Sequence, residues 1–271
     1  MRRFFTHRYT LVYLVVYGLM GMVPIDGCSV NTGVVLHGGK GGATDLAKEA
    51  ESDFGRRPRT PELVSQAYEG MAKAAQRSAA DDPLRYSYLV RAARMGLWLA
   101  HHDEDHEFQT EDVILFCNTA IAIDSSRVEG FYYRAVAMGL IAKANKLKGR
   151  SAMNTMRSDL QAALVRNPDF DHGGPHRILG ALYLRAPGPP TGIGSTRRAL
   201  HHLLHAHQID PKYPDNILFL AEAYQKLKRF DQVKALLIPF IDDGPSTGDE
   251  PAKQAWLDRA RKMLRSLKPT G

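Results

Sequence analysis

The chain has 271 residues, of which 44% are hydrophobic, and its 36 basic and 29 acidic side chains give a formal net charge of +7. Nucleic-acid binders usually cluster their basic residues. Here the basic residues are scattered among acids, which argues against a nucleic-acid partner. A chain of this length can bury one sizeable core.

The N-terminus is organised like an export signal. Arg2, Arg3 and Arg8 stand in a stretch without acids, and a nearly unbroken apolar run over residues 11–23 follows. The run is shorter than the about 20 residues that a membrane-spanning helix needs. A basic start and about 7–15 apolar residues are typical of a secretory signal. We therefore predict that residues 1–27 are a signal peptide.

The end of this signal resembles the lipobox of bacterial lipoproteins, in which a small residue precedes a lipidated cysteine. Gly27 and Cys28 fit the pattern, whereas Asp26 stands where a small neutral residue is usual. We predict a lipoprotein signal and lipidation of Cys28; ordinary cleaved export and a retained anchor are the alternatives. With Ser29 next, the resemblance implies a lipid anchor in the outer membrane, facing the periplasm. An acylated Cys28 leaves Cys117 without a disulfide partner.

The stretch that follows the signal is predicted to be a flexible tether over residues 28–60. It is rich in glycine and charge over 37–45 and 55–60, and such segments bury too little apolar surface to fold alone. Gly39 and Lys40 do not belong to a phosphate-binding loop, because the first glycine and the final Ser or Thr of that motif are missing.

Helical signals begin at Thr60, an N-cap residue followed by Pro61 at the first helical position. Asp82-Pro83 repeats the signal, and strand-like alternation is absent almost everywhere. The sequence therefore predicts an all-α protein. The first helix after the tether has one apolar face, formed by Leu63, Val64, Ala67, Tyr68, Met71, Ala74 and Ala75.

Three similar stretches of the chain recur at a fixed period. Asp124, Asn167 and Asp210 hold equivalent places in them and lie 43 residues apart. A loop rich in Pro and Gly over 186–195 lengthens the second unit and ends at Ser195, a predicted helix cap. Repetition of this kind indicates stacked helix hairpins.

The last unit resembles a tetratricopeptide repeat, because Pro211 and Pro245 lie 34 residues apart. We expect about four helix hairpins and a C-terminal helix over 251–267, stacked as a tetratricopeptide-like solenoid domain over 61–269. The pattern rests on Leu220, Ala221 and Tyr224 in the first helix, Phe230 at the turn, and Val233 and Leu237 in the second helix, with Phe240 replacing the usual Ala.

Stacked hairpins leave a concave groove lined by the first helix of each pair. Aromatic side chains and arginine in such a groove suit an extended or amphipathic protein partner. Packing in the core is the alternative role for the same side chains. The candidate groove residues are Tyr132, Tyr133, Arg134, His176, Arg177, Tyr183, Phe219 and Tyr224.

No motif predicts a catalytic, cofactor or metal site. Residues 101–108 mix three histidines with four acids, but we expect them to form a polar loop. His201 and His205 lie one helical turn apart and are assigned to the helix surface, and His202 stands where a zinc protease carries its catalytic Glu. Cys117 has apolar neighbours and is predicted to lie in the core rather than to act as a nucleophile.

The segment over 172–227 resembles one family, the TatT-type tetratricopeptide-like lipoproteins associated with TRAP transporters. The likeness extends over residues 110–245 and more weakly over 60–110. Pro189 departs from the family, in which an aromatic residue is common at this place. The residues that carry the resemblance are Gly174, Pro175, Arg177, Gly180, Ala186, Pro187, Gly188, Asp210, Pro211, Tyr213, Pro214, Asn216 and Leu220 to Ala223.

This resemblance implies a non-enzymatic, periplasm-facing lipoprotein. Such a protein binds the solute-binding subunit of a tripartite ATP-independent (TRAP) transporter, or passes a small apolar ligand to it. The resemblance also implies a homo-trimer with a hydrophobic channel through each subunit. The alternative is a generic envelope scaffold that binds peptide segments of other proteins.

Overall fold

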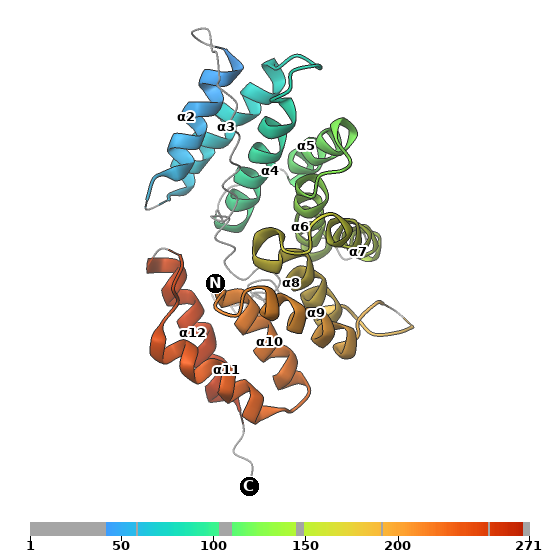
Figure 1. Ribbon diagram of the computed structural model, residues 1–271, viewed down its shortest axis with the longest axis vertical. Helices are drawn as coiled ribbons and strands as arrows, with labels where there is room; N and C mark the ends of the chain where they lie inside the picture. The colour runs from blue at the N-terminus through green and yellow to red at the C-terminus, as the bar shows by residue number, and fades with distance from the viewer. Residues whose placement is uncertain are drawn as a thin grey trace, which may run out of the picture. The chain divides into compact units, whose positions relative to one another are not determined.

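The computed structural model describes residues 42–57, 59–102, 110–144, 149–190, 192–248 and 250–267. All regular secondary structure in these ranges is helical, which confirms the predicted all-α class (Figure 1). The signal peptide, Cys28 and the first part of the predicted tether lie outside the described residues. The helices are α2 (Ala43–Gly55), α3 (Pro61–Arg77), α4 (Arg85–His102), α5 (Thr110–Ile123), α6 (Glu129–Ala144), α7 (Gly149–Arg166), α8 (Phe170–Arg185), α9 (Thr196–Ile209), α10 (Pro214–Lys226), α11 (Phe230–Asp243) and α12 (Glu250–Ser266).

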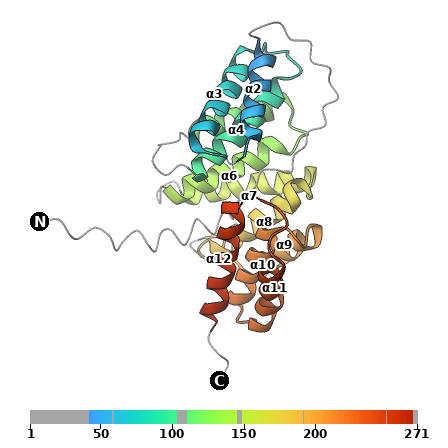
Figure 2. The same ribbon diagram turned by 90° about the vertical axis from the view of Figure 1, so that its left-hand side faces the viewer.

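Consecutive helices pack in pairs, as tetratricopeptide-like hairpins do. The chain divides into two compact units, one over Cys28–Asn167 and one that includes Pro168–Gly271, where the sequence predicted one domain. The first unit contains the pairs α2/α3, α4/α5 and α6/α7. The second contains α8/α9 and α10/α11, and α12 packs against α10 and α11 (Figure 2). The described residues thus form five hairpins and a C-terminal helix, one hairpin more than the predicted four or so.

The additional hairpin arises because part of the predicted tether is helical. Helix α2 packs against α3 and buries Ala47, Ala50 and Phe54. These residues recur at helical spacing and so form one apolar stripe. The ring of Phe54 also lies beneath the guanidinium groups of Arg59 and Arg94, 4.1 and 4.8 Å from its centroid. The prediction of a flexible tether is therefore wrong for residues 43–55, since three well-placed apolar side chains outweigh the surrounding charge.

The predicted helix starts are confirmed at two places. The side chain of Thr60 accepts a hydrogen bond from the backbone N–H of Leu63, and Pro61 is the first residue of α3. Ser195 caps α9 in the same way through the N–H of Arg198. Each cap satisfies one of the N–H groups that a helix leaves free at its start.

The repeat closest to the tetratricopeptide pattern forms α10 and α11. Helix α11 begins at Phe230, the predicted turn residue, and buries Val233, Leu237 and Phe240 against its neighbours. The C-terminal helix forms as α12 and buries Trp256. Among the helices in the described ranges, none is both long and apolar enough to cross a bilayer.

Candidate functional site

Helices α8 and α9 lie unusually close together because glycine residues of α8 face α9. A Cβ atom at Gly180 would lie only 2.6 Å from Cγ of Leu203, and one at Gly173 would lie 3.2 Å from Cα of Ala206. His176 stands between the two glycines in the sequence. The close approach therefore brings the His176 side chain against α9.

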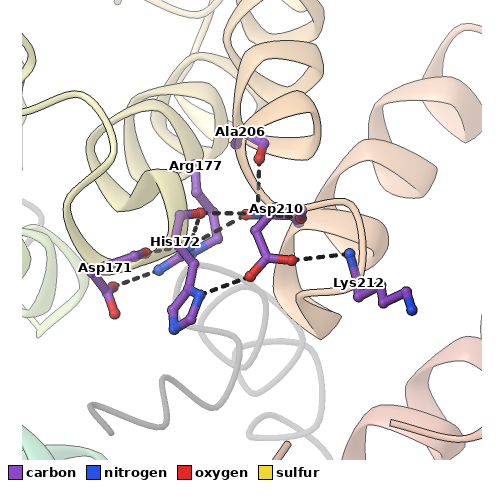
Figure 3. A network of polar contacts seen from close by, with 7 residues as sticks. Asp171, His172, Arg177, Ala206, Asp210 and Lys212 are labelled. Carbon is purple, nitrogen blue, oxygen red and sulfur yellow. Dashed lines mark hydrogen bonds and ion pairs between the residues drawn. The ribbon is translucent and has the colours of Figure 1, made fainter. Parts of the chain in front are cut away.

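The chain enters α8 through a left-handed turn. Asp171, His172 and Gly173 have φ angles of 51°, 56° and 77°. Positive φ is unfavourable for Asp and His by about 1–3 kcal/mol each, so surrounding contacts must stabilise the turn. Arg177 provides them (Figure 3): its Nη1 donates to the backbone oxygens of Asp171 and His172 at 3.0 and 3.3 Å, and its Nη2 donates to the Asp171 carboxylate at 2.6 Å.

Asn216 of α10 completes this network. Its side-chain oxygen accepts a hydrogen bond from Arg177 Nη1 at 3.2 Å. Its amide nitrogen donates to the backbone oxygens of His172, Ala206 and Asp210 at 2.9, 2.9 and 3.0 Å. The Asp210 carboxylate in turn lies 2.8 Å from His172 Nδ1 (Figure 3). One amide side chain thus links the start of α8, the end of α9 and the start of α10.

These contacts give structural roles to residues that carry the family resemblance. Arg177 and Asn216 are fully buried and hold the left-handed turn. The ring of Tyr213 stacks on His172 with a centroid distance of 4.4 Å and lies 4.7 Å from the Arg177 guanidinium carbon. Gly180 permits the close packing of α8 on α9. The resembling segment therefore specifies how three helices meet.

A second polar cluster, which is partly buried, joins α8, α10 and α12. Glu222 accepts hydrogen bonds from Arg185 and Arg259 at 3.0 and 2.9 Å, and both guanidinium carbons lie 4.8 Å from the ring centroid of Phe219. The nearby Asp215 is fully buried. Burial raises the pKa of Asp215 to about 6, against the lowering effect of the arginines and the indole N–H around it.

The predicted groove residues are largely buried. Six of the eight side chains are buried and so do not line an open groove. Their assignment to the groove is wrong, and the alternative of core packing holds for them. The helical periodicity shows which side chains share a face of a helix, but it does not show whether that face is exposed to solvent. The buried residues are Tyr132 and Tyr133 in the first unit, and Arg177, Tyr183, Phe219 and Tyr224 in the second.

Arg134, a seventh predicted groove residue, is held by its neighbours in the first unit. Its Nε and Nη2 donate to the Asp159 carboxylate at 2.8 and 2.6 Å, and its Nη1 donates to Asn118 at 2.7 Å. This fork-like ion pair raises the pKa of Arg134, with the hydrogen bond to Asp159 as the largest cause. Arg134 therefore ties α5, α6 and α7 together.

His176, the eighth predicted residue, belongs to a cluster of imidazoles on the surface of α8 and α9. Its Nδ1 lies 3.1 Å from Nδ1 of His202. Its ring centroid lies 5.1 Å from that of His205, which is itself 4.7 Å from the centroid of His201. His201 and His205 are exposed, as predicted. The sequence indicates that His201, His202 and His205 share one helix, but not that His176 lies beside them, because His176 comes from α8 and reaches α9 through the close packing at Gly173 and Gly180.

The remaining candidates for chemistry have structural positions. Cys117 is fully buried, which confirms the predicted core role, and burial raises the pKa of its thiol. His101 and His102 lie in the last turn of α4 rather than in a loop, and residues 103–108 lie outside the described ranges. In the part of the chain that the structure describes, no group of three His, Cys, Asp or Glu side chains is arranged to hold a metal ion.

Comparisons with known proteins support the fold. Residues 194–249, which include α9 to α11, match the family described as "Tetratricopeptide repeat". The structure is similar to that of TTC0263, a thermophilic TPR protein in Thermus thermophilus, with a TM-score of 0.60 and 16% sequence identity over 82% of this chain and 99% of that chain. No curated protein matches the chain. The chain is thus an all-helical protein with a tetratricopeptide-like arrangement of hairpins.

Proposed function

We propose that this protein acts by binding another protein, as a lipid-anchored module of the bacterial envelope. The observation that carries the proposal is the fold of residues 172–227: the segment with the TatT-type residues forms tetratricopeptide-like hairpins. Hairpin repeats expose long surfaces relative to their core, and such surfaces commonly bind other proteins. The partner that we infer from the resemblance is the solute-binding subunit of a TRAP transporter.

A binding experiment with the intact chain tests the partner. The full chain, extracted in detergent, is mixed with the purified solute-binding subunit of a TRAP transporter from the same organism. Size-exclusion chromatography with light scattering should show a complex of defined mass. A solute-binding protein of an ATP-driven transporter is the matched control and should elute separately. Separate elution of the TRAP subunit as well would contradict the inferred partner.

The two cysteines provide a matched test of the lipid anchor. Cys28→Ser should abolish incorporation of labelled fatty acid and release the protein from the membrane fraction. Cys117→Ser is the control, because this thiol is fully buried in the first unit, and it should leave labelling unchanged. Labelling that persists in Cys28→Ser would place the lipid on another residue, and a native chain that stays in the membrane fraction without any label would favour a retained anchor.

The alternative function is a generic envelope scaffold that binds peptide segments of other proteins. The tetratricopeptide match supports this broader role equally well. The two roles differ in their partner: the scaffold should bind envelope proteins other than a TRAP subunit. Native mass spectrometry of the purified protein should also report the proposed trimer and any apolar ligand that remains bound.

A further inference from the structure

Four histidines lie together on α8 and α9, within a single compact unit. His176 comes from α8, and His201, His202 and His205 come from α9. The ring centroids of neighbouring members are 4.7–5.3 Å apart in the four pairs 176–202, 176–205, 201–202 and 201–205. This grouping is not needed for packing, since His201 and His205 are exposed and the other two are half-buried.

The fold holds these rings in place from several sides. The close contact at Gly173 and Gly180 fixes the distance between α8 and α9 on either side of His176. Tyr183 of α8 stacks on the His202 ring with a centroid distance of 5.7 Å. His202 and His205 are three residues apart on α9, so they face the same side of the helix. The packing of α8 on α9 therefore determines the positions of these rings.

The ring of His176 lies at 5.3 and 5.1 Å from those of His202 and His205, between centroids, which matches the spacing of imidazoles around one metal ion. A Zn–N bond is about 2.0–2.1 Å long, which places two tetrahedral ligand nitrogens about 3.3 Å apart and their ring centroids about 5 Å apart. The Nδ1 atoms of His176 and His202 lie 3.1 Å apart and share a hydrogen bond, so these two nitrogens face each other. The ring nitrogens do not yet converge on one point. Rotation about χ2, which is a broad torsion in histidine, can turn them inward without moving the helices.

The surroundings of the cluster disfavour charged rings. Burial, followed by the neighbouring histidines, lowers the pKa of both His176 and His202 to about 4. Asp169 raises the pKa of His176, and the Arg198 guanidinium carbon lies 5.8 Å from the ring centroid of Tyr183, which stacks on His202.

We propose that His176, His202 and His205 bind a divalent transition-metal ion such as Zn²⁺ at the surface of the α8/α9 hairpin. Imidazole ligands suit Zn²⁺, Ni²⁺ and Cu²⁺ rather than Mg²⁺ or Ca²⁺. His201 lies beside the site and supplies a fourth imidazole, or water fills that position. This site goes beyond the proposed binding function and does not depend on it.

The test uses the full, untagged chain after treatment with a chelator. Titration calorimetry with Zn²⁺ alone should show one ion bound per chain, and Co²⁺ alone should give the visible absorption of a tetrahedral site. His176→Gln and His202→Gln should each weaken Zn²⁺ binding at least tenfold and remove the Co²⁺ band. His207→Gln is the matched control, because His207 is half-buried on the same helix but outside the cluster, and it should bind as the native chain does.

Two results would overturn the proposal. One is the absence of Zn²⁺ binding to the native chain. The other is a His176→Gln, His202→Gln double variant that still binds Zn²⁺ with native affinity, since the chain has 11 histidines and the ion would then lie elsewhere. Circular dichroism of each variant shows that the fold is intact. If a variant unfolds, the native chain is treated with diethyl pyrocarbonate, which modifies imidazoles, in the presence and absence of Zn²⁺. Protection of the cluster histidines by Zn²⁺ supports the site, and modification that Zn²⁺ does not change refutes it.

Discussion

The Arg177 guanidinium of α8 donates a hydrogen bond to the Asn216 side chain of α10 at 3.2 Å, and both residues are fully buried. The same guanidinium pairs with the Asp171 carboxylate. We predict that Arg177→Ala lowers the free energy of unfolding by about 3–5 kcal/mol, because it leaves a buried carboxylate without its partner. Urea denaturation followed by Trp256 fluorescence, in a Trp98→Phe background, reports the unit that contains both residues.

The matched control is Arg197→Ala, which removes an exposed arginine from α9. Its effect should stay within about 0.5 kcal/mol. Arg177→Lys keeps the charge but loses the planar guanidinium fork. Its loss in the free energy of unfolding should lie between the losses of Arg177→Ala and Arg197→Ala. A loss below about 1 kcal/mol for Arg177→Ala would mean that the left-handed turn does not depend on this side chain.

The close packing of α8 on α9 predicts a strong effect of one added methyl group. Gly180→Ala places a Cβ atom 2.6 Å from Cγ of Leu203, so the helices must separate or Leu203 must leave its rotamer. We expect a loss of about 1–3 kcal/mol in the free energy of unfolding. Gly55→Ala is the control, because nothing lies within 4 Å of the added atom there. Leu203→Ala should partly relieve the loss in the Gly180→Ala background, with a coupling of at least about 0.5 kcal/mol. Strictly additive losses would show that Leu203 does not limit this contact.

The packing of α2 against α3 predicts that its apolar stripe stabilises the first unit. Phe54 is 2% exposed, and Phe54→Ala should lower the free energy of unfolding by about 3–5 kcal/mol. Trp98 fluorescence in a Trp256→Phe background measures this unit. Lys48→Ala changes an exposed residue of α2 and should have little effect. If neither substitution changes the free energy of unfolding, the predicted flexible tether would be correct for residues 43–55.

The parts of the fold that could be predicted from the sequence are those that depend on nearby residues. Thr60 with Pro61 and Ser195 marked helix starts, since a cap is decided within one helical turn. The 34-residue spacing of Pro211 and Pro245 indicated the α10/α11 hairpin, because this is the length of one tetratricopeptide repeat, whose two helices follow each other in the chain. Helix α2 was missed because its three buried residues are separated by charges that look like linker composition.

The arrangement of the candidate site could not be predicted, because it depends on contacts between helices. The sequence pattern leaves both a groove position and a core position open for Arg177, and its hydrogen-bond partners at the left-handed turn and in Asn216 become visible only in the fold. The meeting of His176 with His202 depends on how closely α8 approaches α9. Periodicity assigns each residue to a face of its own helix, but it does not show which residue of another helix lies opposite.

The buried carboxylate of Asp215 predicts that the stability of the second unit depends on pH. Its pKa in the folded chain is about 6, above the ordinary value of 3.8 that applies when the chain unfolds. The folded state therefore binds the proton more tightly, so this group's stabilising contribution is fully present below pH 3.8 and is lost as pH rises through 6. Asp215→Asn removes the ionisation. The free energy of unfolding of the variant minus that of the native chain should rise by about 2 kcal/mol from pH 4 to pH 7. Urea denaturation at both pH values, followed by Trp256 fluorescence in the Trp98→Phe background, measures this difference. Parallel pH profiles of the two proteins would show that Asp215 is ionised throughout, with its charge compensated by the arginines that surround it.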